Sequence, residues 1–171
     1  MSSTNVIERT IERCSVLLVD DNQYSRKLTR MLLANIGIKK VHEATDGIAG
    51  LEAIRSLVPD IVMLDWEMPL LNGAELVRIV RSPGVFPTPD VPIIIVSGYG
   101  ERWRVHEAMR LGVHEFLVKP VSAKALRDRV LSIVVKPRQT IQFGEYYGPE
   151  PRGRFAPGLP PGAADASTAV A

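Results

Sequence analysis

Short apolar runs alternate with segments of helical periodicity through the middle of this 171-residue chain. The clearest runs cover residues 16–19, 61–64, 93–96 and 116–118, and a weaker one covers residues 40–44. Continuous β-branched and aliphatic runs of this length are typical of strands buried on both faces of a parallel sheet. The pattern therefore predicts five strands.

Between and after these runs, apolar residues recur with the spacing of amphipathic helices. The first predicted helix covers residues 23–36 and ends at Gly37, and Asp46 is the predicted N-cap of the second. The later helices carry their apolar stripes at Leu76, Val77 and Val80, at Val105, Ala108 and Met109, and at Leu126, Val130 and Ile133. Five strand–helix units predict an α/β fold, a doubly wound five-stranded parallel sheet with helices on both faces.

Composition divides the chain into three parts. Residues 1–13 form a polar, charged N-terminal extension without the apolar core of an export signal, and residues 14–135 hold the five strand–helix units. Residues 136–171 contain six prolines and five glycines and show no apolar periodicity, so we expect a disordered tail. Within this tail, the aromatic residues and glycines of residues 143–149 leave three alternatives open: a short docking motif, a segment that folds back on the domain, or an inert linker.

Charge and cysteine content exclude several classes of protein. Charged residues make up 23% of the chain and the formal net charge is +2, which implies no strong field for nucleic acid or an anionic membrane. Cys14 is the single cysteine, so we expect no internal disulfide and no cysteine metal site, and we interpret it as a packing residue. No apolar stretch approaches the ~20 residues that span a bilayer, and we expect a soluble cytoplasmic protein.

Polar side chains follow four of the predicted strands. Asp20 and Asp21 follow the first strand, Asp65 ends the third, Ser97 ends the fourth and Lys119 follows the fifth. Because ligands of open α/β sheets bind outside the carboxyl ends of the strands, these side chains should converge at one edge. Three neighbouring carboxylates would raise one another's pKa values. Mg²⁺, a hard cation that prefers oxygen ligands, would relieve this repulsion, so the edge is suited to phosphoryl transfer.

Simpler interpretations of these residues remain open. The three aspartates could merely cap helices or solvate loops, although that leaves Ser97 and Lys119 at the ends of their own strands without an explanation. The sequence contains no Gly-rich phosphate loop of the Walker type and no nucleophile elbow around Ser97. The histidines fall on different elements and are interpreted as surface or packing residues: His42, His106 and His114.

As a set, these positions resemble the signature of a response-regulator receiver domain of two-component signalling, of the stand-alone, single-domain type. The resemblance spans about residues 15–135 and rests on Asp20-Asp21, Leu64-Asp65-Trp66-Glu67-Met68-Pro69, Ser97-Gly98 and Lys119-Pro120. It implies a flavodoxin-like fold. It also implies that Asp65 accepts a phosphoryl group from a phosphohistidine, with Mg²⁺ held by Asp20, Asp21, Asp65 and the backbone carbonyl of Glu67.

The resemblance implies roles for the other residues of the signature. Lys119 would pair with the acceptor carboxylate and then with a phosphoryl oxygen, and Ser97 would donate a hydrogen bond to another phosphoryl oxygen. Phe116 stands at the aromatic switch position, and Lys119-Pro120 resembles the cis peptide of the family. Two residues depart from the commonest ones. Glu67 places a carboxylate near the path of an attacking water, and Phe116 lacks the hydroxyl of the more usual tyrosine.

We expect a histidine kinase or a histidine phosphotransfer protein as phosphodonor, and a downstream protein as the target. The balanced charge of the tail argues against direct nucleic-acid binding, and no output enzyme is expected. Trp103, His106 and Arg110 share one helix face with the composition of a binding hot spot, although a solvated face is the alternative. Two other functions compete: a phosphatase with an aspartate nucleophile, which would want an aspartate where Glu67 stands, and an interaction scaffold that does not depend on phosphate.

Overall fold

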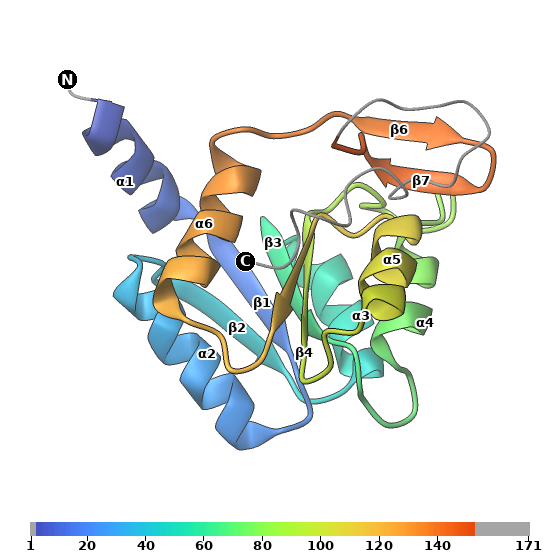
Figure 1. Ribbon diagram of the computed structural model, residues 1–171, viewed down its shortest axis with the longest axis horizontal. Coiled ribbons are helices and arrows are strands. Elements are labelled where there is room, and N and C mark those ends of the chain that lie inside the picture. Colours follow the sequence, from blue (N-terminus) through green and yellow to red (C-terminus); the bar gives the residue numbers. More distant parts are fainter. Residues whose placement is uncertain (1–2, 153–171) are drawn as a thin grey trace.

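Five parallel strands form the central sheet in the order β2-β1-β3-β4-β5, and this computed structural model describes residues 3–152 (Figure 1). The strands are β1 (Ser15–Val19), β2 (Lys40–Ala44), β3 (Ile61–Asp65), β4 (Ile93–Ser97) and β5 (Glu115–Val118). Strands β3 and β4 are buried along their whole length, as expected of strands covered on both faces. The predicted α/β fold is confirmed.

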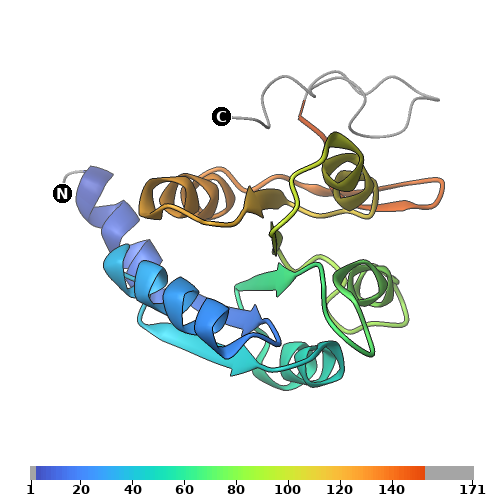
Figure 2. The same cartoon turned by 60° about the horizontal axis from the view of Figure 1, so that its bottom comes forward.

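Helices cover both faces of this sheet (Figure 2). One face carries α1 (Ser3–Arg13), α2 (Gln23–Asn35) and α6 (Ala123–Val134), and the other carries α3 (Gly47–Leu57), α4 (Gly73–Val80) and α5 (Arg102–Arg110). Successive residues of a strand point to opposite faces. In β1, Leu17 and Val19 therefore pack with α3 and α4, whereas Val16 and Leu18 pack with α2 and α6.

Side-chain caps place the starts of four helices. The side chains of Asn22, Asp46, Asn72 and Ser122 each accept a hydrogen bond from a backbone N–H in the first turn of the helix that follows. Such caps satisfy N–H groups that have no partner within the helix. The predicted N-cap at Asp46 is confirmed.

The N-terminal extension is a helix that packs on the domain. In α1, Ile11 is buried in the same core cluster as α2 and α6, and Ile7 packs against that cluster. Cys14 is buried at the start of the sheet, where burial and the nearby Asp60 raise its pKa to about 11, which suits a packing residue. Among the described residues, no helix is long and apolar enough to cross a membrane.

The expectation of disorder from residue 136 onward is wrong for residues 140–149. They form an antiparallel hairpin of β6 (Thr140–Phe143) and β7 (Tyr146–Pro149), so the fold-back alternative is the one the structure shows. Gly112, with φ +93, lets the carbonyl of Tyr147 approach so closely that a Cβ atom there would lie 2.2 Å from it. These contacts join distant parts of the chain, so the local apolar pattern of the sequence does not predict them. The remainder of the predicted tail, 153–171, lies outside the described residues.

Candidate functional site

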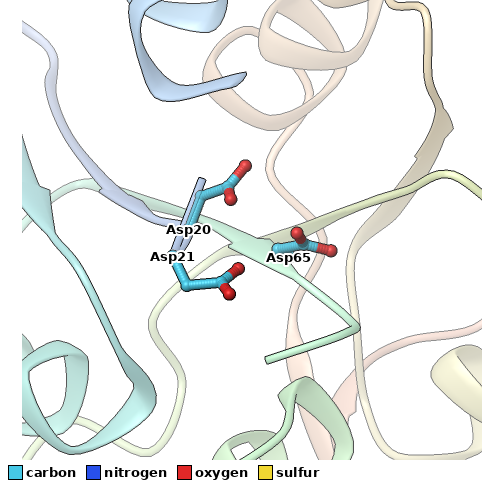
Figure 3. A group of neighbouring side chains, drawn as sticks. All are labelled: Asp20, Asp21 and Asp65. Atoms are coloured by element: carbon cyan, nitrogen blue, oxygen red, sulfur yellow. The ribbon is translucent and has the colours of Figure 1, made fainter. Parts of the chain in front are cut away.

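The three predicted aspartates meet at the carboxyl end of the sheet (Figure 3). Asp20 follows β1 directly and Asp65 ends β3, and the pairing of Val19 with Leu64 sets the two carboxylates side by side. With Asp21 they bring oxygen atoms within 4.8 Å of one another. Asp20 and Asp65 are each 8% exposed, whereas Asp21 is exposed.

Lys119 reaches into this cluster from the end of β5. Its Nζ lies 3.1 Å from Asp20 Oδ2 and 3.2 Å from Asp65 Oδ2, so one ammonium bridges the two buried carboxylates. The Lys119-Pro120 peptide is cis, as the resemblance implied, and the Lys119 N–H donates to the Ser97 carbonyl at 2.8 Å. The structure thus brings the predicted lysine and aspartates together.

Backbone N–H groups two residues further along orient three of the site's side chains. Asn22 N–H donates to Asp20 Oδ1 at 2.8 Å, and Glu67 N–H donates to Asp65 Oδ1 at 3.1 Å. Ser97 follows the same pattern, since its Oγ accepts from the N–H of the second residue after it, Tyr99, at 3.1 Å. Each loop therefore fixes the side chain that ends its strand.

The site holds more negative than positive charge. Burial, together with Asp20, raises the pKa of Asp65 above its usual value, although Lys119 and the Glu67 N–H act in the opposite direction. Burial alone would lower the pKa of Lys119, but Asp65 and Asp20 outweigh it and raise this pKa. Three carboxylates and one ammonium leave two uncompensated negative charges. The donor set therefore fits a hard divalent cation with oxygen ligands, such as Mg²⁺.

The two predicted switch residues are buried on the neighbouring strands β4 and β5. Ser97 is fully buried at the end of β4, opposite Val118 of β5. Phe116 is 7% exposed and belongs to the core cluster on the α5 side of the sheet.

The predicted helix face lies on α5, near the site. Trp103 is 58% exposed and Arg110 is exposed, whereas His106 is half-buried. Ala108, on the opposite side of the helix, is fully buried. The predicted separation of an inner and an outer face is therefore present, with His106 at its margin.

Two groups of residues were missed by the sequence analysis. Arg104 forms an ion pair with Glu67, and its guanidinium stacks on the rings of Tyr99 and Trp103. At the opposite edge of the sheet, Glu115 is 1% exposed and is surrounded by arginines. No local pattern marks either group, because the partners come from separate loops and helices.

Comparisons with known proteins agree with this geometry. Residues 16–131 match the response regulator receiver domain family. The chemotaxis protein CheY of Pseudomonas aeruginosa is 31% identical over 118 residues, which cover 69% of this chain and 94% of that protein. The protein-glutamate methylesterase/protein-glutamine glutaminase 1 of Myxococcus xanthus is 34% identical over 167 residues, but these cover 94% of this chain and only 45% of that enzyme.

Solved structures give the same result. The signal receiver domain of the response regulator NarL from Mycobacterium tuberculosis superposes with a TM-score of 0.63 at 30% identity, covering 72% of this chain and 97% of that domain. The fold, the sheet order and the matched residues therefore agree. This chain belongs to the response regulator receiver domain family.

Proposed function

We propose that this protein is a phospho-accepting response regulator in a histidine-to-aspartate phosphorelay, with Asp65 as the acceptor. The observation that carries the proposal is the convergence of Asp20, Asp21 and Asp65 within 4.8 Å, with Lys119 bridging two of them at the carboxyl end of the sheet. The phosphodonor is a histidine kinase or a histidine phosphotransfer protein. Membership in the receiver family supports both statements.

The reaction asks the protein mainly for positioning and for charge neutralisation. A carboxylate oxygen of Asp65 attacks the phosphorus of a phosphohistidine, the P–N bond breaks, and its electron pair returns to the imidazole of the donor. Lys119 moves with the charge from the carboxylate to a phosphoryl oxygen, and the Ser97 hydroxyl donates to another. Asp20, Asp21, Asp65 and the Glu67 carbonyl would hold Mg²⁺, which would neutralise charge on the phosphoryl oxygens.

Both competing functions fit the site less well. A phosphatase with an aspartate nucleophile needs an acid two residues further on, but the Glu67 carboxylate there is paired with Arg104. A scaffold that does not depend on phosphate would have no use for two buried carboxylates that share one ammonium. We therefore favour a signalling domain over an output enzyme.

Phosphorylation is proposed to switch a surface that binds another protein rather than nucleic acid. The acyl phosphate adds close to two negative charges beside Ser97. When the Ser97 hydroxyl turns toward the phosphoryl group, the space beside Phe116 and the packing of α5 change. On α5, the proposed partner surface consists of Trp103, His106 and Arg110. Phosphorylation would shift an equilibrium between two arrangements of these residues toward the one with Phe116 inward.

Labelling with a small phosphodonor tests the acceptor. Wild type incubated with radiolabelled acetyl phosphate and Mg²⁺ should gain one phosphoryl group that is labile to acid and to base, and Asp65→Asn or chelation of Mg²⁺ should abolish it. Asp90→Asn, which changes an exposed aspartate at the other edge of the sheet, is the matched control. Continuous release of phosphate with many turnovers would favour the phosphatase. A folded wild type that is never labelled would favour the scaffold.

Phe116→Ala tests the switch separately. Asp65 should still be labelled, but binding of the downstream partner should no longer depend on phosphate, because the α5 side of the core loses the ring that responds to the site. Equal partner affinity for phosphorylated wild type and phosphorylated Phe116→Ala would show that the ring does not transmit the signal.

A further inference from the structure

Arg104, in the first turn of α5, contacts side chains from both sides of the candidate phosphoryl-acceptor site. Its guanidinium pairs with the Glu67 carboxylate of the loop after β3, and Nε lies 3.2 Å from Glu101 Oε2. The same guanidinium lies over the ring of Tyr99 at 4.9 Å and over the ring of Trp103 at 4.7 Å, measured to the ring centroids. Its side chain is 18% exposed, so these contacts nearly enclose it.

The contacts of Arg104 continue into the site through two equivalent hydrogen bonds. Glu67, which carries the paired carboxylate, donates its N–H to Asp65 Oδ1. Tyr99, which carries one of the stacked rings, donates its N–H to Ser97 Oγ. Arg104 is therefore linked to the Asp65 carboxylate through Glu67, and to the Ser97 hydroxyl through Tyr99. On its other side it touches Trp103, which is 58% exposed and belongs to the proposed partner surface.

We propose that Arg104 is a positioning residue that links the state of Asp65 and Ser97 to the orientation of Trp103. The inference rests on the proposed function, since it assumes that Asp65 is phosphorylated. In the unphosphorylated protein, the pair with Glu67 and the stack on Tyr99 hold the loops after β3 and β4 together and hold the Trp103 ring against the guanidinium.

Phosphorylation weakens both links to Arg104. The new negative charge at Asp65 repels the Glu67 carboxylate, whose backbone is hydrogen-bonded to the acceptor, and so disfavours its present position beside Arg104. When Ser97 turns its hydroxyl toward the phosphoryl group, the N–H of Tyr99 follows or loses its acceptor, and the stacked ring moves. Arg104 then releases Trp103 to a partner.

A purely structural role accounts poorly for this arrangement. Glu67 and Glu101 are about half exposed, and ion pairs with exposed carboxylates contribute little to stability. The contacts that distinguish Arg104 from a lysine are the two ring stacks, which depend on its planar guanidinium. Each stack at a partly exposed site corresponds to roughly two- to five-fold in an equilibrium between two arrangements.

Fluorine NMR of protein labelled with 5-fluorotryptophan tests the link directly. The chain has two tryptophans, so Trp66 and Trp103 give separate signals that a Trp103→Phe variant assigns. Wild type, Arg104→Met, Arg104→Lys and Glu67→Gln are compared with and without acetyl phosphate and Mg²⁺, at matched labelling of Asp65. Arg102→Met is the control, because this neighbouring exposed arginine has no ion pair or ring contact that the described residues show.

In wild type the Trp103 signal should shift on phosphorylation. In Arg104→Met it should lie near the phosphorylated position before any phosphodonor is added, and at least half of the phosphorylation-dependent shift should be lost. Arg104→Lys, which keeps the charge but not the planar stack, and Glu67→Gln should fall between, and Arg102→Met should match wild type.

A Trp103 signal in Arg104→Met that matches wild type in both states would overturn the inference and leave the proposed function intact. A wild type that acetyl phosphate never labels would instead overturn the proposed function. Unfolding curves of each variant identify any that fails to fold. For such a variant, the two conservative changes, Arg104→Lys and Glu67→Gln, carry the test.

Discussion

The two edges of the sheet each bury a carboxylate, but they neutralise it differently. At the carboxyl edge, Asp65 shares the ammonium of Lys119 with Asp20, and Asp21 lies nearby. At the amino edge, both oxygens of Glu115 are paired: Arg129 and Arg152 contact Oε2 at 3.2 and 3.3 Å, and Ser132 donates to Oε1 at 3.1 Å. Arg152 also pairs with Oε1.

The two buried carboxylates differ in how fully their charge is neutralised. A buried charge is costly unless it is paired and hydrogen-bonded. Glu115 meets this condition through residues of α6 and through Arg152, which follows the hairpin, so it ties the C-terminal segment to β5. Asp65 meets it only in part, because it shares the single ammonium of Lys119 with Asp20, and burial raises its pKa.

Removing the charge of Glu115, whose two oxygens are both paired, should have the largest effect on stability. Glu115→Gln leaves three arginines without their counter-charge, and we expect a loss of about 3 kcal/mol in the free energy of unfolding, at the lower end for a buried pair because these arginines reach solvent. Urea denaturation measures it. Glu107→Gln, which breaks an exposed pair with Arg78, is the control and should cost less than ~1 kcal/mol. Equal losses would contradict the structural role of Glu115.

Substitutions in the aspartate cluster at the carboxyl end of the sheet should weaken cation binding. Even the loss of residues that only orient metal ligands weakens affinity roughly 10–100-fold, so Asp20→Ala/Asp21→Ala should weaken Mg²⁺ binding at least tenfold. The fluorescence of Trp66, which adjoins Asp65, reports the titration. Asp90→Ala should bind as wild type does. An unchanged midpoint in the double variant would place the cation elsewhere.

His114, at the amino end of the sheet, should determine how the free energy of unfolding decreases in acid. His114 accepts the Ile93 N–H on Nδ1 beside Arg81, and burial, reinforced by Arg81, lowers its pKa to about 3. Because the unfolded chain binds this proton near pH 6.5 and the fold does not, stability falls as the pH drops below 6.5. By pH 5 the loss is about 2 kcal/mol.

A substitution that keeps a hydrogen-bond acceptor for the Ile93 N–H but does not titrate should remove this loss of stability in acid. His114→Asn retains an acceptor near the Nδ1 position and should show a flatter stability profile between pH 7 and pH 5 in urea denaturation. His42→Asn, at an exposed histidine, should keep the wild-type profile. If His114→Asn is as sensitive to acid as wild type, the titrating group lies elsewhere.

The smallest expected effect has the opposite sign. Since the pKa of Asp65 is raised in the folded protein, its ionised form opposes folding at neutral pH. The free energy of unfolding therefore decreases as the pH rises through this raised pKa. Asp65→Asn should therefore stabilise the metal-free protein by up to ~1–2 kcal/mol at pH 7 while phosphorylation is abolished. Denaturation in a chelator measures this change. A destabilised Asn variant would show that Lys119 compensates the charge fully.

The sequence by itself determined most of the domain and the position of its acidic cluster. Apolar runs that end at Asp20, Asp65, Ser97 and Lys119 are a local signal, and the parallel topology makes the ends of such runs neighbours. The strands, the helix cap at Asp46 and the meeting of Asp20, Asp65 and Lys119 were therefore predictable.

Only the tertiary structure decided the contacts that join distant segments. The hairpin packs through Gly112 and is linked to the domain by Arg138, which donates to the His114 carbonyl, and no periodicity in a Pro- and Gly-rich segment reveals such partners. The links of Arg104 to Glu67 and Tyr99 are of the same kind. A side chain's own neighbours set local propensity, but the partners of a buried or enclosed charge come from whatever the fold brings to it, and these are absent from the local pattern.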